Sequence, residues 1–429
     1  MEAATMKTSE KRNRCRVSAA VTRQKPILHS VRGQAASTEL LEIAEHEQEF
    51  DRSLLDLVKN RLDDTVHFGK TYSVSELAIY LRGMFGHTLF FDSLLSIVQQ
   101  YAIADVDVVS ERTKPGAVGL RTGFNLSLFG HPGTGKTFAT LDMIIGKQEK
   151  GVQPHGLPGK NRYCGGMTPA AFIEIGQAYE GRRFNFIVTE FNDWFKYKGM
   201  VEPLKLAMDR GTIKRETTRG VIGPYKFSSF FSANYNVDVK MSGYRATVSD
   251  VNFNAIEDRM LCRLHRLTKD RYQDIAESQS KLALGEIVMD RAQAIRDHVT
   301  LLHAIETRHP AVEGMFPYKP ILLTTEAFDT MKKAREAIME HLKYKESLEF
   351  SPRLEMRAVQ LACAMSLLSY FQMDKEYITI DRNALNLATR FYVEEASIRS
   401  KEEFRPEVLL WDLGIPKLEI FPSKGSSSS

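Results

Sequence analysis

The sequence predicts an α/β fold in which helices cover a mainly parallel sheet, with further helical regions before and after it. Three observations lead to this prediction. Short apolar runs alternate with helical segments between residues 118 and 269, a glycine-rich loop joins one such run to a helix, and the chain beyond residue 268 has helical periodicity alone. Alternation of this kind indicates βαβ units with parallel strands.

Composition limits the class of protein. The chain has 429 residues, a net charge of +4, and hydrophobic and charged fractions of 43% and 26%, which are ordinary for a globular protein. No apolar run approaches the roughly 18 residues of a membrane span, so we expect no transmembrane segment and no signal peptide. We therefore predict a cytoplasmic or nucleoid-associated protein.

The cysteines argue against a zinc site. They lie far apart, without a C-x-x-C pair or a Cys/His cluster. Isolated, reduced thiols fit a cytosolic protein, and we expect at least three of them to be packing residues. They are Cys15, Cys164, Cys262 and Cys363.

The two ends of the chain read as tails. Residues 1–36 hold eight Lys or Arg against two Glu and few large apolar side chains, which predicts a basic disordered tail. Contact with nucleic acid, a solvated tail and an organelle transit peptide all remain open for it. Residues 421–429 read as flexible.

Residues 37–117 are predicted to be helical. LLEIAEHEQEFDRSLLDLVKNRL has apolar residues three and four apart, and SVSELAIYLRGMF begins with a serine suited to cap a helix. The Pro- and Gly-containing stretch ERTKPGAVGLRTG then indicates a linker.

Residues 118–269 form the predicted core. Its candidate strands are NLSLF (125–129), FNFIVT (184–189), KFSSFFSA (226–233) and LCRLHRL (261–267). Residues 270–420 are predicted to contain helices only. In one of them Thr324 is the N-cap and Phe328, Met331, Ala334, Ile338 and Leu342 form an apolar face, and in another Asp381 caps a helix with Leu385, Ala388 and Tyr392 inward.

A phosphate-binding loop follows the first candidate strand of the core. NLSLF-GHPGTGKT-FATLDMIIG reads as strand, loop and helix. The glycines allow a tight turn whose N–H groups point at a phosphate, and the helix adds the positive end of its dipole. Lys136 would neutralise the β- and γ-phosphates of ATP, and the Thr137 hydroxyl would ligate Mg²⁺. The loop comprises Gly130, His131, Pro132, Gly133, Thr134, Gly135, Lys136 and Thr137.

Two further strand ends carry polar groups suited to hydrolysis. Glu190 ends the run FNFIVTE, where it would face the loop from the adjacent strand and polarise the attacking water. Asn234, at the predicted end of KFSSFFSAN, would hydrogen-bond the γ-phosphate or this water, although an asparagine there is often only a turn residue.

The order of these motifs resembles the MCM and MoxR branch of AAA+ ATPases. The segment from Thr189 to Asn236 looks like that branch's stretch from Walker B to sensor 1, including a β-hairpin at about Thr212–Phe227. AIEDRMLCRL resembles the arginine-finger segment and SPRLEMRAVQLACAMSLL resembles the sensor 2 helix of the lid, so residues 270–420 would be a helical lid. The resemblance assigns the finger to Arg259, with Arg263 and Arg266 as competitors, and sensor 2 to Arg353, with Arg357 as its rival.

The resemblance covers residues 118–400 and implies a homo-hexameric ring. In such a ring Arg259 of one subunit would reach the γ-phosphate held by its neighbour. The chain departs from the family pattern in two ways. Thr189 replaces the family's Asp, which leaves Mg²⁺ support to Asp193 or weakens it. The region before residue 118 looks too short and too helical for an MCM DNA-binding OB-fold domain, and it lacks that domain's zinc cysteines.

The substrate of such a motor remains open. A DNA helicase or translocase would grip phosphates with Lys214, Arg215 and Arg219 on the hairpin. A MoxR-like enzyme would instead remodel a protein partner. A nucleotide-gated switch with little turnover is the third class, which Thr189 makes conceivable.

Overall fold

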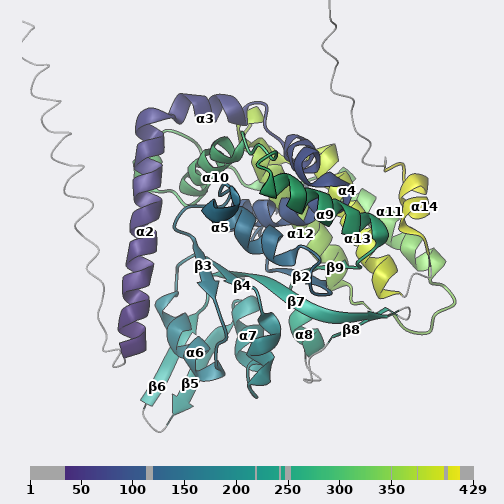
Figure 1. The fold of residues 1–429 in the computed structure, drawn as a ribbon, viewed down its shortest axis with the longest axis horizontal. Coiled ribbons are helices and arrows are strands. Elements are labelled where there is room, and N and C mark those ends of the chain that lie inside the picture. The colour runs from purple at the N-terminus through teal and green to yellow at the C-terminus, as the bar shows by residue number, and fades with distance from the viewer. Residues whose placement is uncertain are drawn as a thin grey trace, which may run out of the picture.

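A five-stranded parallel sheet forms the centre of the computed structural model, which describes residues 34–112, 119–217, 220–240, 243–246, 253–348, 350–373, 375–400 and 404–415. Its strands run in the order β3, β4, β7, β2 and β9, and β8 adds an antiparallel partner to β7 (Figure 1). The predicted α/β fold with a mainly parallel sheet is confirmed. The strands are β2 (Leu126–Gly130), β3 (Asn161–Cys164), β4 (Asn185–Val188), β7 (Phe230–Lys240), β8 (Gly243–Ala246) and β9 (Leu261–His265).

One face of this sheet carries short helices and a hairpin, drawn below the sheet in Figure 1. Their core is unusually aromatic: Phe172, Trp194 and Phe231 pack together with ring centroids 5.7–6.2 Å apart. The elements are α6 (Pro169–Ala178), η3 (Phe191–Lys196), α7 (Val201–Met208), the antiparallel strands β5 (Thr212–Thr217) and β6 (Gly220–Lys226), and α8 (Phe253–Glu257).

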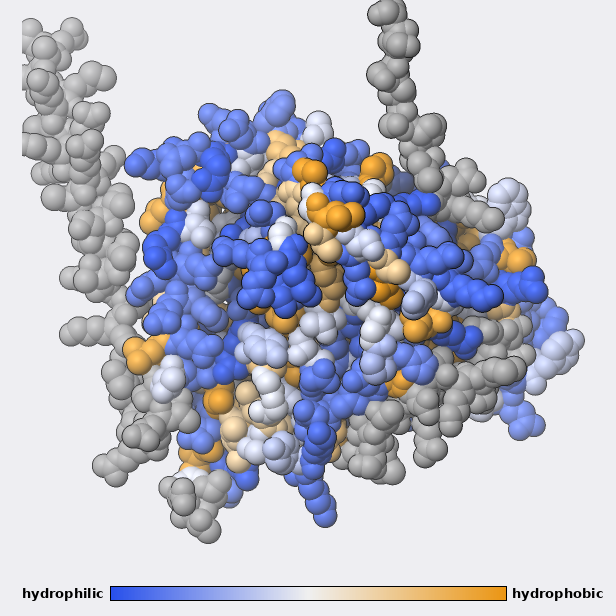
Figure 2. Space-filling view, viewed as in Figure 1, coloured by the Kyte–Doolittle hydropathy of each residue, from blue (hydrophilic) through white to orange (hydrophobic). Residues whose placement is uncertain are grey.

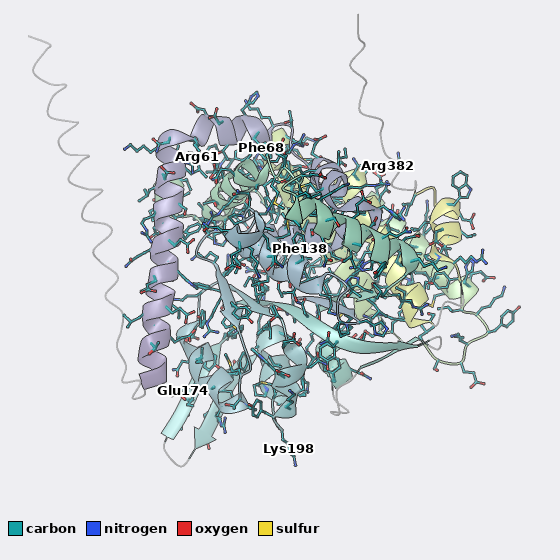
Figure 3. All side chains as sticks on the ribbon, in the orientation of Figure 1. Arg61, Phe68, Phe138, Glu174, Lys198 and Arg382 are labelled. Atoms are coloured by element: carbon teal, nitrogen blue, oxygen red, sulfur yellow. The ribbon has the colours of Figure 1, made fainter. Side chains whose placement is uncertain are left out.

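The other face is covered by the helix that follows the glycine-rich loop and by helices from both ends of the chain (Figure 1). The loop helix starts as a π-helical segment, and its Phe138 lies near the centre of the view in Figure 3. The elements are α4 (Val74–Ala102), η1 (Phe138–Asp142), α5 (Met143–Ile145), η2 (Gln148–Lys150), α9 (Lys269–Ala283), α10 (Ala292–Glu306), α11 (Thr325–His341), α12 (Arg353–Ser366), η5 (Leu367–Gln372), α13 (Arg382–Arg399) and α14 (Pro406–Asp412).

The N-terminal helices belong to the same body as the C-terminal ones. The long helix α2 (Gln34–Asn60) turns at Arg61, which ion-pairs with Asp297 of α10 at 2.7 Å, into α3 (Leu62–Gly69) (Figure 3). Gln99 of α4 donates to the carbonyl oxygens of Phe124 and Phe231, which fastens α4 to the sheet. One hydrophobic core joins these helices to α10, α12 and α13.

A second, small parallel sheet also joins the two regions. β1 (Val108–Ser110) pairs with β10 (Ile321–Leu323), which pairs with β11 (Ile378–Thr379). The prediction that residues beyond 268 are purely helical is therefore wrong. These strands have two or three residues each, and the η4 turn (Pro310–Val312) precedes β10.

Several local predictions are confirmed. Ser73, Thr324 and Asp381 cap α4, α11 and α13 through their side-chain oxygens. Phe328 is the exception on the predicted face of α11, because its side chain is 45% exposed. Cys164, Cys262 and Cys363 are buried free thiols, and burial raises the pKa of Cys164 to about 11.

The ends of the chain extend past the predictions or fall outside the description. Helix α2 begins at Gln34, inside the segment predicted to be a tail. Residues 1–33, Cys15 among them, and residues 416–429 lie outside the described residues, as do 113–118 of the predicted linker. Among the described helices, none combines the length and apolarity that crossing a bilayer requires. The face drawn in Figure 2 is mostly hydrophilic, with single hydrophobic residues scattered over it.

Candidate functional site

The glycine-rich loop leaves the carboxyl end of β2 in the middle of the sheet. Gly130 lies beside His265 of β9, and a Cβ atom at Gly130 would stand 2.9 Å from the His265 Cβ, so no side chain fits there. Gly133 and Gly135 have φ angles of 78° and 86°, a region in which only glycine is unstrained. These three glycines are therefore required by the shape of the loop.

Lys136 lies inside this loop. Its side-chain Nζ donates to the carbonyl oxygens of Gly130 at 2.9 Å and His131 at 2.7 Å. The residue is only 6% exposed, and burial lowers the pKa of its ammonium to about 8, although the Glu190 carboxylate opposes this shift. A buried cation encircled by backbone is suited to bind an oxyanion.

Glu190 faces the loop from the end of β4, but β4 is not the neighbour of β2. Strand β7 lies between them, so the prediction of an adjacent strand is wrong by one strand. The carboxyl ends of parallel strands meet at one edge of a sheet, which explains why Glu190 still acts electrostatically on Lys136. Its exposed carboxylate can accept a proton from a water at this edge.

Asn234 occupies the space between Glu190 and the loop. It lies inside β7, opposite Leu128, and not at a strand end as predicted, because β7 continues to Lys240. Its Nδ2 donates to the Thr137 Oγ at 3.3 Å, and Thr140 Oγ donates to its Oδ1 at 3.1 Å. The structure thus joins the predicted polar strand residue to the predicted metal ligand.

The residues around Glu190 have their own partners. The Thr189 and Tyr163 hydroxyls lie 3.3 Å apart, and the Asp193 carboxylate ion-pairs with Lys196 Nζ at 2.7 Å. In the described part of the chain, no group of three or more His, Cys, Asp and Glu could hold a metal ion. A magnesium ion that takes most of its ligands from phosphates and water needs no such group.

A buried ion network supports the loop from behind, and no motif in the sequence indicates it. Arg271, near the start of α9, donates from Nη2 to the Thr134 carbonyl oxygen and to the Asp92 carboxylate, both at 2.6 Å. His265 lies 3.5 Å from the same carboxylate oxygen. Burial and the nearby Arg271 lower the pKa of His265 well below its usual value, so His265 is neutral.

A cavity of about 1070 Å³ opens beside the loop. Gly135, Thr137 and Phe138 line it together with apolar side chains of α4 and α9, including Leu89 and Leu282. Pockets of about this size hold drug-sized and cofactor-sized ligands. If the loop binds phosphate, an apolar wall beside it would suit the base and sugar of a nucleotide.

Arg259 and Arg353 lie at the opposite edge of the sheet from the loop. Leu261 donates its N–H to Asn125 at the amino ends of β9 and β2, which places Arg259, two residues earlier, at that edge. Arg259 Nε donates to the Asp209 carboxylate at 2.7 Å, and Arg353 Nη1 lies 3.3 Å from the Asp258 carboxylate. Neither arginine is brought to the loop of its own chain.

The competing arginines differ in position. Arg263 lies within β9, pairs with Glu394 at 2.5 Å and stacks over Phe91, so it belongs to the core. Arg266 follows β9 at its carboxyl end. Arg357, the rival of Arg353, donates to the Gln360 side-chain oxygen at 2.8 Å.

The predicted hairpin is present as β5 and β6. Lys214 Nζ pairs with Glu216 Oε1 at 2.6 Å, and Arg215 lies in register with Ile222 on the partner strand. Arg219 lies outside the described residues. The described part of the hairpin therefore has three basic residues: Lys214, which is paired, Arg215 and Lys226.

Comparison with known proteins adds no identification: no protein-family model and no curated protein matches this chain.

Proposed function

We propose that the protein binds ATP·Mg²⁺ at Gly130–Thr137 and hydrolyses ATP as a subunit of an AAA+ ring resembling the MCM and MoxR branch. The observation that carries this proposal is the position of Lys136, buried in the loop with Glu190 and Asn234 at the same edge of the sheet. A cation, an acid and an amide arranged around one phosphate-sized position are the groups that phosphoryl transfer to water needs.

Each residue has a separate role in this proposal. Lys136 exchanges its carbonyl partners for β- and γ-phosphate oxygens, and Thr137 offers its hydroxyl to Mg²⁺. Glu190 polarises the attacking water, and Asn234 orients it or the γ-phosphate. The cavity beside Phe138 holds the adenosine.

The arginines support a ring. Arg259 and Arg353 lie at the edge opposite the loop, so in a ring they would meet the nucleotide of another subunit and not their own. In the single chain they pair with Asp209 and Asp258. A homo-hexamer is the assembly that the resemblance implies.

DNA is the proposed substrate of this motor, contacted through Lys214 and Arg215 of the hairpin. The ion pair between Lys214 and Glu216 favours a second candidate, a MoxR-like enzyme that remodels a protein, because it reduces the positive charge of the hairpin. A slow, switch-like ATPase is the third candidate, because Thr189 stands where the family has the Asp that supports Mg²⁺.

An ATPase assay with and without DNA tests the proposal. We expect steady turnover that Mg²⁺ chelation abolishes and that single- or double-stranded DNA stimulates. Turnover that ignores DNA but responds to a protein partner would support remodelling instead. Tight ATP binding without turnover would support the switch, and no ATP binding would exclude all three.

A further inference from the structure

A second cavity, of about 760 Å³, lies outside the loop and is lined by arginines. None of the residues 130–137 lines it. It lies between the edge strand β9 and the helices α4, α9, α13 and α14, whereas the cavity proposed for adenosine lies beside the loop helix. Its arginines are Arg82, Arg263, Arg266, Arg271, Arg390 and Arg405.

The charge of this cavity is positive. Among the described lining residues, six arginines stand against two glutamates, Glu394 and Glu407. Three more carboxylates lie behind the wall: Asp92, which pairs with Arg271, Glu395, which lies 3.7 Å from Arg263, and Asp274, which accepts from the Thr88 hydroxyl. Even with these included, the guanidinium groups outnumber the carboxylates by six to five.

Part of this charge has a structural use. Glu394 is shared by Arg263 and Arg390, and these pairs tie β9 to α13. Ion pairs of this kind explain why some arginines gather here. They do not explain why six arginines from five segments of the chain surround one open volume.

We propose that this cavity binds a phosphate-bearing small anion at a site separate from the loop. Guanidinium forks bind phosphate oxygens in a bidentate way, and the volume lies within the range of small-ligand pockets. The shared chemistry is a polyphosphate, whether free or attached to a nucleoside. The proposal is independent of ATP hydrolysis at the loop.

Arg271 connects the two sites. It lines the cavity and also donates to the Thr134 carbonyl oxygen of the loop. A substitution at Arg271 would therefore disturb both sites, so the test uses residues that line the cavity alone.

Pyrophosphate is the probe, measured by isothermal titration calorimetry on the full chain. Lys136→Ala removes binding at the loop, and in this background we expect one remaining pyrophosphate site per chain. Adding Arg82→Gln and Arg405→Gln should weaken that site at least tenfold. Arg382→Gln, at an exposed arginine of α13 that does not line the cavity, should leave it unchanged.

The outcomes separate clearly. No pyrophosphate binding to Lys136→Ala, or equal binding after the two cavity substitutions, would overturn the proposal. Equal affinity for sulfate would also overturn it, since the cavity would then hold an adventitious ion only. Tighter binding of ADP than of pyrophosphate to the Lys136→Ala variant would identify a nucleoside polyphosphate as the occupant, and weaker binding a free polyphosphate; both results support the site.

The folding of the variants is controlled by their melting temperatures. If the double substitution lowers the melting temperature, the single Arg405→Gln variant replaces it, because Arg405 is exposed and precedes the short helix α14. If Arg405→Gln and Arg82→Gln are both folded and each binds pyrophosphate with unchanged affinity, the proposal is contradicted.

Discussion

Lys136 is the residue on which the site depends. A lysine that is 6% exposed loses hydration, and two backbone carbonyl oxygens compensate for that loss only in part. Its pKa of about 8 records this balance. A triphosphate would supply the full negative charge that the carbonyl groups lack, so binding and protonation of Lys136 are linked.

ATP affinity should therefore fall as pH rises through about 8. The free site loses its proton near that pH, whereas bound phosphate holds the ammonium charged, so binding at higher pH requires proton uptake. We expect roughly tenfold weaker binding at pH 9 than at pH 7. Calorimetry in buffers of different ionisation enthalpy measures both effects, and any ATP binding that Lys136→Arg retains should lack the pH dependence. An affinity that stays flat to pH 9 would contradict the linkage.

Glu190 should govern turnover and not binding. Glu190→Gln keeps the shape of the side chain and removes its basicity, so ATP affinity should stay within a few-fold while turnover falls by roughly 10²–10⁴-fold. Glu202→Gln serves as the matched control, because Glu202 is an exposed glutamate of α7 that ion-pairs with Lys205. Equal losses in both variants would argue that the loss of a negative charge matters and that no single acid acts as the base.

At the scale of elements, the sequence predicted those features that depend on neighbouring residues, such as glycine turns and helix caps. Positive φ angles at Gly133 and Gly135 and side-chain caps at Thr324 and Asp381 depend on neighbours within a few residues. β2, β4 and β9 also lie close to the predicted apolar runs. Strand β3 was missed because it is an edge strand of mixed polarity, with Tyr163 54% exposed.

Elements held by distant partners could not be predicted in the same way. β1, β10 and β11 are too short to show a period, and the pairing of β1 with β10 joins segments more than 200 residues apart. The network of Asp92, His265 and Arg271 behind the loop depends on α4 packing against α9 and β9. No spacing in the sequence marks these contacts.

The hairpin β5–β6 is the element that tests the nature of the substrate. Lys214→Ala with Arg215→Ala should leave basal turnover intact and abolish its stimulation by DNA, and it should reduce the salt dependence of DNA binding. Lys198→Ala, which removes one positive charge from an exposed lysine near the start of α7 (Figure 3), is the control outside the hairpin. DNA stimulation that survives the double substitution would remove the hairpin from the DNA contact.

At the scale of the whole molecule, the edges of the sheet divide the chemistry. The loop, Glu190 and Asn234 lie at the carboxyl edge, and Arg259 and Arg353 lie at the amino edge. A single chain therefore holds the two halves of the proposed catalytic site on opposite sides. On the proposed ring, contact between copies would complete it.

Mixing variants tests this division. Arg259→Ala and Glu190→Gln subunits should each turn over ATP slowly, and their mixture should recover part of the activity, because some interfaces combine an intact acid with an intact finger. A mixture of Lys136→Ala and Glu190→Gln should not recover, because both substitutions damage the same side of every interface. Equal behaviour of the two mixtures would contradict a finger acting between subunits.

ATP binding to the full chain, compared with its Lys136→Ala variant, is the most direct test of the central claim that Gly130–Thr137 holds a nucleotide. Calorimetry should find that the variant binds one ATP per chain fewer than the unmodified protein, with similar melting temperatures for both in the absence of ATP. Equal ATP affinity in the two proteins would show that the nucleotide lies elsewhere.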